Sequence, residues 1–114
     1  MKLAIGIAFA YALIFATWAL YLAAMNLKAH LPTMGPVAKV HGYALVAVAI
    51  AFDAFVNLAI GTMLFADRPR EWLLTARLKR YHQDAQYAGT WRARLAEWIC
   101  SHLLDQFDPS GDHC

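Results

Sequence analysis

AFDAFVNLAIGTMLF, residues 51–65, is an apolar run interrupted by two polar side chains, Asp53 and Asn57. Positions i and i+4 lie on one face of a helix, so the two side chains point the same way. An ionised carboxylate exposed to lipid costs at least about 2.5–3.5 kcal/mol. If this run crosses a membrane, its polar face must therefore turn toward protein or a water path, or carry a protonated carboxyl group.

The chain of 114 residues contains two long runs of this apolar kind. Residues 3–25 hold no charged side chain, and as a helix they extend roughly 34 Å, enough to cross a hydrocarbon core of about 30 Å. The second run covers about residues 40–66, and Asp53 is the one charge within residues 42–66. The mean hydropathy of +0.40 also exceeds that of a typical soluble domain. We expect an all-α protein in which residues 1–66 form a two-helix transmembrane hairpin.

A cleaved signal peptide is the alternative interpretation of the first run. That run is longer than the apolar core of about 7–15 residues in a signal peptide, and bulky residues occupy positions 21 and 22, where a cleavage site needs small ones. An uncleaved membrane anchor is therefore expected. Pro32, Gly35 and Pro36 break the helix between the two runs, which predicts an antiparallel reversal.

Lysine and arginine side chains near the ends of the runs predict the orientation in the membrane. The connecting segment carries Lys28 and Lys39, whereas the second run is followed by five cations: Arg68, Arg70, Arg77, Lys79 and Arg80. Because cationic segments stay in the cytoplasm, we expect an inner (cytoplasmic) membrane protein with both termini cytoplasmic. Two cysteines in that reducing compartment would not form a structural disulfide. The net charge of +2 is too small to indicate nucleic-acid binding.

Residues 67–114 are expected to form a cytoplasmic tail of two amphipathic helices. Pro69 marks the exit from the membrane, and Leu74, Leu78 and Tyr81 then form an apolar line at helical spacing. This first tail helix either lies on the inner leaflet or packs on its neighbour in the tail. On the leaflet, the five cations after the second run would form a basic membrane-surface site.

The second tail helix is expected to begin after Gly89, with Thr90 as its N-cap. Its apolar stripe consists of Trp91, Leu95, Trp98 and His102, joined by Ile99 and Leu103. Such a stripe is typical of a packing surface, and we predict that Trp91, Leu95, Trp98 and His102 bind a partner. Residues 67–94 carry seven cations and three anions, whereas residues 95–114 carry four anions and no lysine or arginine. Only the first part of the tail therefore suits an anionic membrane surface.

Asp53 and Asn57 form a candidate intramembrane polar site, and Gly61 lies one turn further along the same helix. Folding the chain about its loop brings Tyr11 to the depth between the two polar residues. The expected partner is therefore Tyr11, or the same pair on a second copy. A structural hydrogen bond, a proton-titrating site, a pore lining and a lock between subunits all fit this pattern.

The sequence contains no nucleophile–base pair, phosphate-binding loop or carboxylate dyad, so we expect neither enzyme activity nor a cofactor. Cys100, His102, His113 and Cys114 lack the spacings of a zinc site, and no metal is expected. The stretch FDPSGD, residues 107–112, lacks the length and the closing Glu of a calcium loop and predicts a turn.

Ten polar, aromatic and small residues follow one another along the chain in an order similar to that of other proteins. They are Asp53, Asn57, Gly61, Glu71, Thr75, Arg77, Asp105, Phe107, His113 and Cys114. This order resembles a group of small phage and prophage proteins without an assigned function, whose pattern is D-x3-N-x3-G-G, then E-T-x-S-x-R, then an acidic-aromatic segment ending in H-C. Here Thr62 replaces the second glycine, and Trp72 stands where the small threonine would be. The resemblance implies that Asp53 and Asn57 contact the tail.

Together these features predict a phage or prophage membrane protein that assembles through its helices in the lipid bilayer, as a homo-oligomer. Its tail would bind a host or phage protein, as a host-takeover or superinfection-exclusion factor does. The alternative is a holin-like pore former with two spans and a basic tail. The aromatic-rich helical tail favours the binding role.

Overall fold

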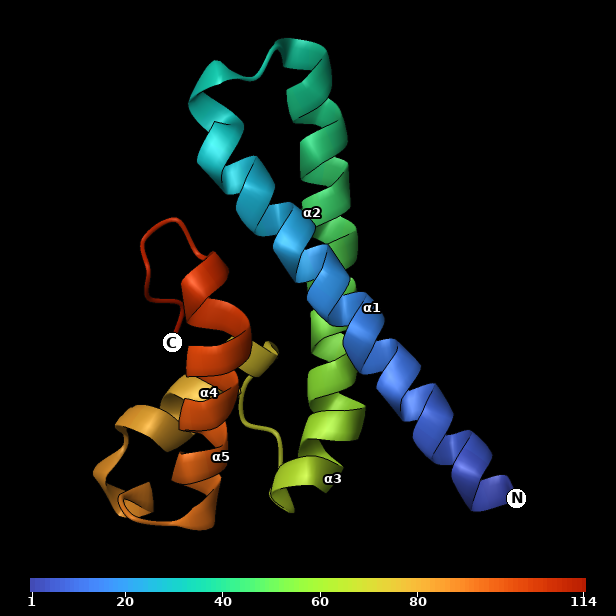
Figure 1. Cartoon of the computed structure of the whole chain (residues 1–114), viewed down its shortest axis with the longest axis vertical. Coiled ribbons are helices and arrows are strands. Elements are labelled where there is room, and N and C mark those ends of the chain that lie inside the picture. Colours follow the sequence, from blue (N-terminus) through green and yellow to red (C-terminus); the bar gives the residue numbers. More distant parts are fainter.

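The computed structural model describes all 114 residues, and every regular element in it is helical, which confirms the all-α class. The first half consists of α1 (Lys2–His30), η1 (Leu31–Thr33), α2 (Pro36–Val56), η2 (Asn57–Gly61) and α3 (Thr62–Phe65). The elements α2, η2 and α3 form one continuous rod, within which η2 is a π-helical turn. Figure 1 shows that α1 and this rod run antiparallel and cross at an angle.

The chain reverses where its helix breakers predict. Pro32 lies in η1, Gly35 is extended, and Pro36 occupies the first turn of α2, where its missing N–H costs no hydrogen bond. Gly42 lies where α2 approaches α1, since a Cβ there would be 3.4 Å from Leu27 Cδ2. A small residue therefore allows the close contact near the loop.

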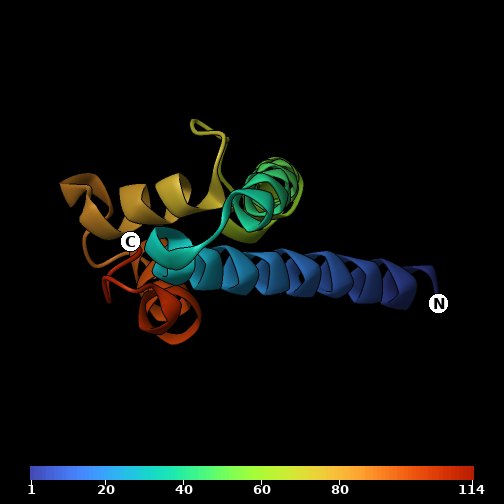
Figure 2. The same cartoon turned by 90° about the horizontal axis from the view of Figure 1, so that it is seen from above.

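Two segments, Lys2–Thr33 and Pro36–Phe65, are long and apolar enough to cross a membrane. The first half of α1 is almost uncovered, and Figure 2 shows it extending away from the rest of the chain. Its exposed large side chains include Leu3, Ile5, Ile7, Phe9 and Phe15. Apolar area of this extent is rarely left in water and is typical of a surface that binds a membrane or another protein.

The second half contains α4 (Leu74–Gln83), η3 (Ala85–Tyr87), α5 (Trp91–Ile99), η4 (Cys100–Leu104, a π-helical turn) and η5 (Asp105–Phe107). The predicted start of the second tail helix is confirmed, because Thr90 Oγ1 accepts a hydrogen bond from the Ala93 amide at 3.3 Å. Gly89 precedes it with a φ of 76°, a conformation that glycine adopts without strain.

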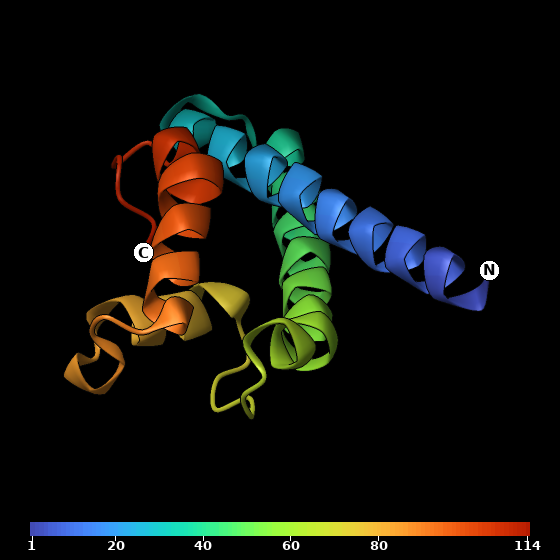
Figure 3. The same cartoon turned by 60° about the horizontal axis from the view of Figure 1, so that its bottom comes forward.

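The core lies within the tail and at the end of the α2 rod. It consists of Phe65, Leu78, Tyr81, Ala96, Cys100 and Cys114. Because Leu78 and Tyr81 are fully buried there, α4 packs on α5, which is one of the two arrangements that the sequence left open. Figure 3 shows the end of the α5–η4 segment beside α1, whereas α4 is the tail helix that contacts α2 and η2. The tail is therefore folded back onto the long helices.

Candidate functional site

The carboxylate of Asp53 caps a helix of the tail. Its Oδ2 accepts a hydrogen bond from the amide of Leu74, the first residue of α4, at 2.9 Å. The N-cap position of α4 is Leu73, whose side chain offers no acceptor. A helix N-terminus has unsatisfied amides and a positive dipole end, so a carboxylate stabilises it. The acidic residue in the apolar run thus fixes where α4 begins.

Asn57 holds the segment that leads into α4. Its side chain is fully buried, and Nδ2 donates to the carbonyls of Glu71, at 2.6 Å, and Trp72, at 3.1 Å. Its Oδ1 has no hydrogen-bond partner. Backbone carbonyls outside regular helix need hydrogen-bond donors from elsewhere, and the Asn57 side chain supplies two such bonds.

Gly61 provides the space for a buried arginine of the tail. A Cβ at Gly61 would lie 3.5 Å from Nη1 of Arg77, which is itself fully buried. The Arg77 guanidinium donates to the Asp67 carbonyl at 3.4 Å and to Thr62 Oγ1 at 3.2 Å. Gly61 therefore serves close contact with the tail rather than with the other long helix.

The predicted contact between Tyr11 and the polar pair is wrong. Tyr11 is 68% exposed and stacks on Phe15, with ring centroids 6.4 Å apart. The cause is the crossing of the helices, which carries the first half of α1 away from α2 (Figure 1). Asp53 and Asn57 instead bind main-chain groups of the tail, the kind of contact that the resemblance implied.

The basic membrane-surface site is corrected for two of its five residues. Arg77 is buried, and Arg80 forms ion pairs with Glu71 and with Asp67, whose Oδ2 lies 3.2 Å from Arg80 Nη1. The Tyr81 hydroxyl and Arg80 hold the pKa of Asp67 below its ordinary value. A count of charges along the chain does not show which arginines bind partners inside the fold, so these two could not be recognised. The remaining three, Arg68, Arg70 and Lys79, are exposed.

The predicted partner-binding stripe divides into an inner and an outer part. Leu95 packs on the core. Trp98 is 52% exposed, and its ring stacks on the ring of exposed His102, with the ring centroids 4.7 Å apart. Trp91 is half exposed and lies parallel to the ring of Phe65. Trp98 and His102 lie about one helical turn apart, and they form an exposed aromatic pair.

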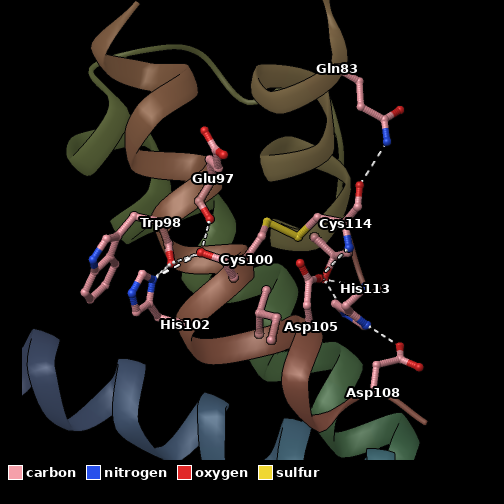
Figure 4. Close-up of a disulfide and its surroundings, with 12 residues drawn as sticks. Gln83, Glu97, Trp98, Cys100, His102, Asp105, Asp108, His113 and Cys114 are labelled. Carbon is pink, nitrogen blue, oxygen red and sulfur yellow. Dashed lines mark hydrogen bonds and ion pairs between the residues drawn. A yellow bond between two sulfur atoms is a disulfide. The ribbon is translucent and has the colours of Figure 1, made fainter. Parts of the chain in front are cut away.

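The two cysteines form a disulfide, Cys100–Cys114, contrary to the expectation from a cytoplasmic tail (Figure 4). This bond leaves no thiolate for a metal. Disulfides persist in oxidising compartments, so the bond opposes the orientation that the lysine and arginine count predicts. The bond ties the last residue of the chain to the π-helical turn that follows α5.

Hydrogen bonds fix the backbone next to the disulfide (Figure 4). Asp105 Oδ1 accepts from the amides of His113, at 2.8 Å, and Cys114, at 3.2 Å. The Gln83 side chain donates to the Cys114 carbonyl at 2.9 Å. The disulfide, Asp105 and Gln83 therefore hold the end of the chain in place, and none of these three contacts involves the His113 ring.

The His113 ring joins two side chains from distant parts of the tail. Its Nδ1 lies 2.9 Å from Asp108 Oδ2, and its Nε2 lies 3.0 Å from Thr75 Oγ1. The ring also meets Tyr21 edge-on at 4.7 Å. Sequence reasoning missed this cluster, because 33 residues separate Thr75 from Asp108 and no short motif contains both.

Asp108 is the buried anion of this cluster, with 7% of its surface exposed. It accepts bonds from Lys28 Nζ, at 3.0 Å, and from the amide and hydroxyl of Ser110. Burial by itself would raise its pKa, but the bonds from His113, Ser110 and Lys28 outweigh burial and hold the pKa of Asp108 below its ordinary value. The group is thus ionised at neutral pH. Its bonds to Ser110, with Gly111 at a φ of 80°, confirm the predicted turn.

An apolar cavity of about 130 Å³ lies beside this cluster, between α1, the α2 rod, α4 and η4. Thr75 and Asp53 are among its few polar lining residues. Two aromatic side chains of α1 form part of its wall and also bind η4: Trp18 Nε1 donates to the Leu103 carbonyl at 2.9 Å, and the Tyr21 hydroxyl donates to the Leu104 carbonyl. These bonds join η4 to α1 beside the cavity.

The fold and the site define an all-α protein with two helices long and apolar enough to cross a membrane, and with a C-terminal helical unit docked on both. Comparison with protein-family models, curated proteins and solved structures gives no match to this chain.

Proposed function

We propose that this chain is a small integral membrane protein of phage or prophage type that acts by binding a host or phage protein. Host takeover or exclusion of a second phage is the role that such a protein would have. The observation that carries this proposal is the outward pair Trp98–His102 on a tail that is rigidly docked. Exposed aromatic side chains on a rigid support are typical of protein-binding surfaces.

The rigidity of this surface has identifiable sources. Ala96 and Cys100 of the same helical segment are buried in the core, and the disulfide also links Cys100 to Cys114. Trp98 therefore reaches a partner with little loss of conformational freedom, which favours affinity. The uncovered half of α1 supports the further proposal that lipid and a second copy of this chain cover its apolar side chains.

A paired substitution tests the binding role. Trp98→Ala with His102→Ala is expected to abolish protection of the expressing host against a second phage, at unchanged protein level. Trp72→Ala is the matched control, because Trp72 is 75% exposed and lies away from α5 in the sequence. Equal protection by the parent and by the paired variant would refute this role for the surface.

The holin-like pore former is the alternative, and the uncovered face of α1 is the feature that favours it, since pores require assembly of helices. Against it, Asp53 and Asn57 are occupied by the tail and do not line a channel. Timed expression with a membrane-potential dye separates the two functions. A pore former would depolarise the membrane abruptly, whereas the binding role leaves the membrane tight.

The orientation is proposed from two opposed indicators. The cations after the second long helix favour a cytoplasmic tail. The disulfide Cys100–Cys114 requires an oxidising compartment, and cytoplasmic reductants would open it. Because the disulfide belongs to the folded tail itself, we give it more weight. We propose an inner-membrane protein with its tail and both termini on the oxidising side, in place of the cytoplasmic orientation.

A further inference from the structure

We propose that Thr75, His113 and Asp108 form a nucleophile–base–acid triad that cleaves an ester or thioester whose hydrophobic acyl chain occupies the adjacent cavity. This activity does not depend on the binding role. It rests on the three side chains, on their supports and on the cavity that Thr75 lines.

The two hydrogen bonds have the polarity that such a triad needs. Asp108 is an ionised acceptor, so its bond at 2.9 Å places the proton of neutral His113 on Nδ1. The lone pair of Nε2 then faces the Thr75 hydroxyl at 3.0 Å and accepts its proton. Nucleophile and base within hydrogen-bond reach, with the base oriented by a third group, is the arrangement found in acyl-transfer enzymes.

The structure holds the nucleophile at the start of a ten-residue helix. Thr75 is the second residue of α4, and the preceding amide, that of Leu74, is bound by Asp53. The amides of Thr75 and Ala76 belong to the first turn, where no carbonyl of the helix can accept them. They are positioned to stabilise negative charge that develops on a carbonyl oxygen next to the Thr75 hydroxyl.

The His113 bonds are more than an anchor for the end of the chain. The disulfide, Asp105 and Gln83 already hold that end through bonds that do not involve the imidazole. The ring is nevertheless directed at the Thr75 hydroxyl and bound to an ionised carboxylate. Positioning by separate groups is what a general base requires, since its ring must keep one orientation while protons move.

The cavity indicates the class of substrate. Eleven of its fifteen lining residues are hydrophobic, among them Trp18, Leu74 and Leu104. A charged acid would lose its hydration there, whereas the acyl chain of an ester or thioester would bury apolar surface. Soluble acyl esters and membrane phospholipids share this chemistry.

The reaction balances without a further reagent. The Thr75 oxygen attacks the carbonyl carbon while Nε2 of His113 takes the hydroxyl proton. That proton passes to the leaving oxygen or sulfur, so an alcohol or thiol departs and an acyl ester remains on Thr75. Water, deprotonated by His113, then cleaves this ester and releases the carboxylic acid, and the threonine hydroxyl is restored.

The test uses the full chain purified in detergent, with p-nitrophenyl acetate, butyrate and octanoate as probes. Turnover by the parent and by Thr75→Ser is expected, with the octanoate preferred. Thr75→Val, which keeps the shape but removes the hydroxyl, and His113→Gln are each expected to lower turnover about a hundred-fold or more. His82→Gln is the matched control for direct attack by an imidazole, because His82 is exposed and lies outside both the cluster and the Trp98–His102 pair.

Acid quenching and peptide mass spectrometry should find the octanoyl group on Thr75 of the parent. If folded parent and folded Thr75→Val hydrolyse all three esters equally, or if no acyl group is found on Thr75, the proposal is wrong. Should Thr75→Val fail to fold, the parent, Thr75→Ser and the site of acylation still decide it. Vesicles of phosphatidylglycerol in a parallel assay identify the source: fatty acid released there indicates a membrane lipid, and hydrolysis of the soluble esters alone indicates a free acyl ester.

Discussion

Replacing Asp53 and Asn57 by leucine, singly and together, is expected to loosen the docked tail progressively. Both side chains bind main-chain groups: the Leu74 amide for Asp53, and the carbonyls of Glu71 and Trp72 for Asn57. No second substitution in α2 removes those groups. The double variant should therefore be no more stable than the less stable of the two single variants.

The magnitudes follow from the bonds that are lost. Removing a helix cap costs about 0.5–2 kcal/mol, which is the expectation for Asp53→Leu. Removing the buried Asn57 amide leaves two carbonyls without their donor, and an unsatisfied buried group costs about 1–3 kcal/mol. Because both side chains hold the same short segment, their losses are coupled, and the combined loss is expected to lie between the larger single loss and the sum, at about 1–5 kcal/mol.

Thermal melting in detergent and hydrogen exchange at the start of α4 measure these effects. Each 1 kcal/mol lowers the Tm of a small domain by about 4–8 °C, so the double variant should melt well below the parent. Phe55→Leu is the control, because Phe55 is 56% exposed on the same helix. If the double variant regains the Tm of the parent, the two polar residues pair with each other or with a removable side chain, and the capping argument fails.

Three further outcomes are expected. Gly61→Leu should undock the tail, because the added side chain meets the buried arginine beneath it, whereas Gly6→Leu should leave the Tm unchanged, since nothing lies within 4 Å there. In cells, Cys100 and Cys114 should resist alkylation until a reductant is added and then react with an impermeant reagent from outside, and reduction should remove about 3 kcal/mol of stability. Because the pKa of Asp108 is lower in the folded chain than its ordinary value near 4, its contribution to stability is complete above about pH 4 and is lost as the pH falls further. Melting at a series of pH values should show this loss, and Asp108→Asn should flatten it.

The sequence was sufficient for the features that depend on local patterns. Apolar runs of helical length gave the two long helices, the prolines around Gly35 gave the reversal, and Thr90 gave the start of α5. Each of these depends on residues close together in the chain. The spacing of Leu78 and Tyr81 also gave the correct apolar line of α4, although it left open what that line packs against.

The docking of the tail could not be derived in this way. The groups that Asp53 and Asn57 bind are backbone amides and carbonyls, which every residue carries and no pattern marks. The stripe of α5 left open which of its members pack on the core, since helical spacing does not name the neighbouring element. The disulfide was excluded through an assumption about the compartment, not through the spacing of the cysteines.

The docked tail also determines how much of α2 can face lipid. Because the first residue of α4, Leu74, is bound to Asp53, the segment before α4 runs back along the last turns of the rod, and it carries exposed Arg68 and Arg70. In the proposed membrane arrangement, the tail would therefore take the place of lipid along that side of the rod beyond Asp53. The part before it, residues 36–52, extends roughly 25 Å as a helix, near the lower limit for crossing a bilayer. If the chain spans a membrane as proposed, Asp53 lies where lipid gives way to the tail, and its carboxylate meets the start of α4 there instead of hydrocarbon. The polar pair at residues 53 and 57 would then mark the boundary of the span, which would explain how an apolar helix tolerates it.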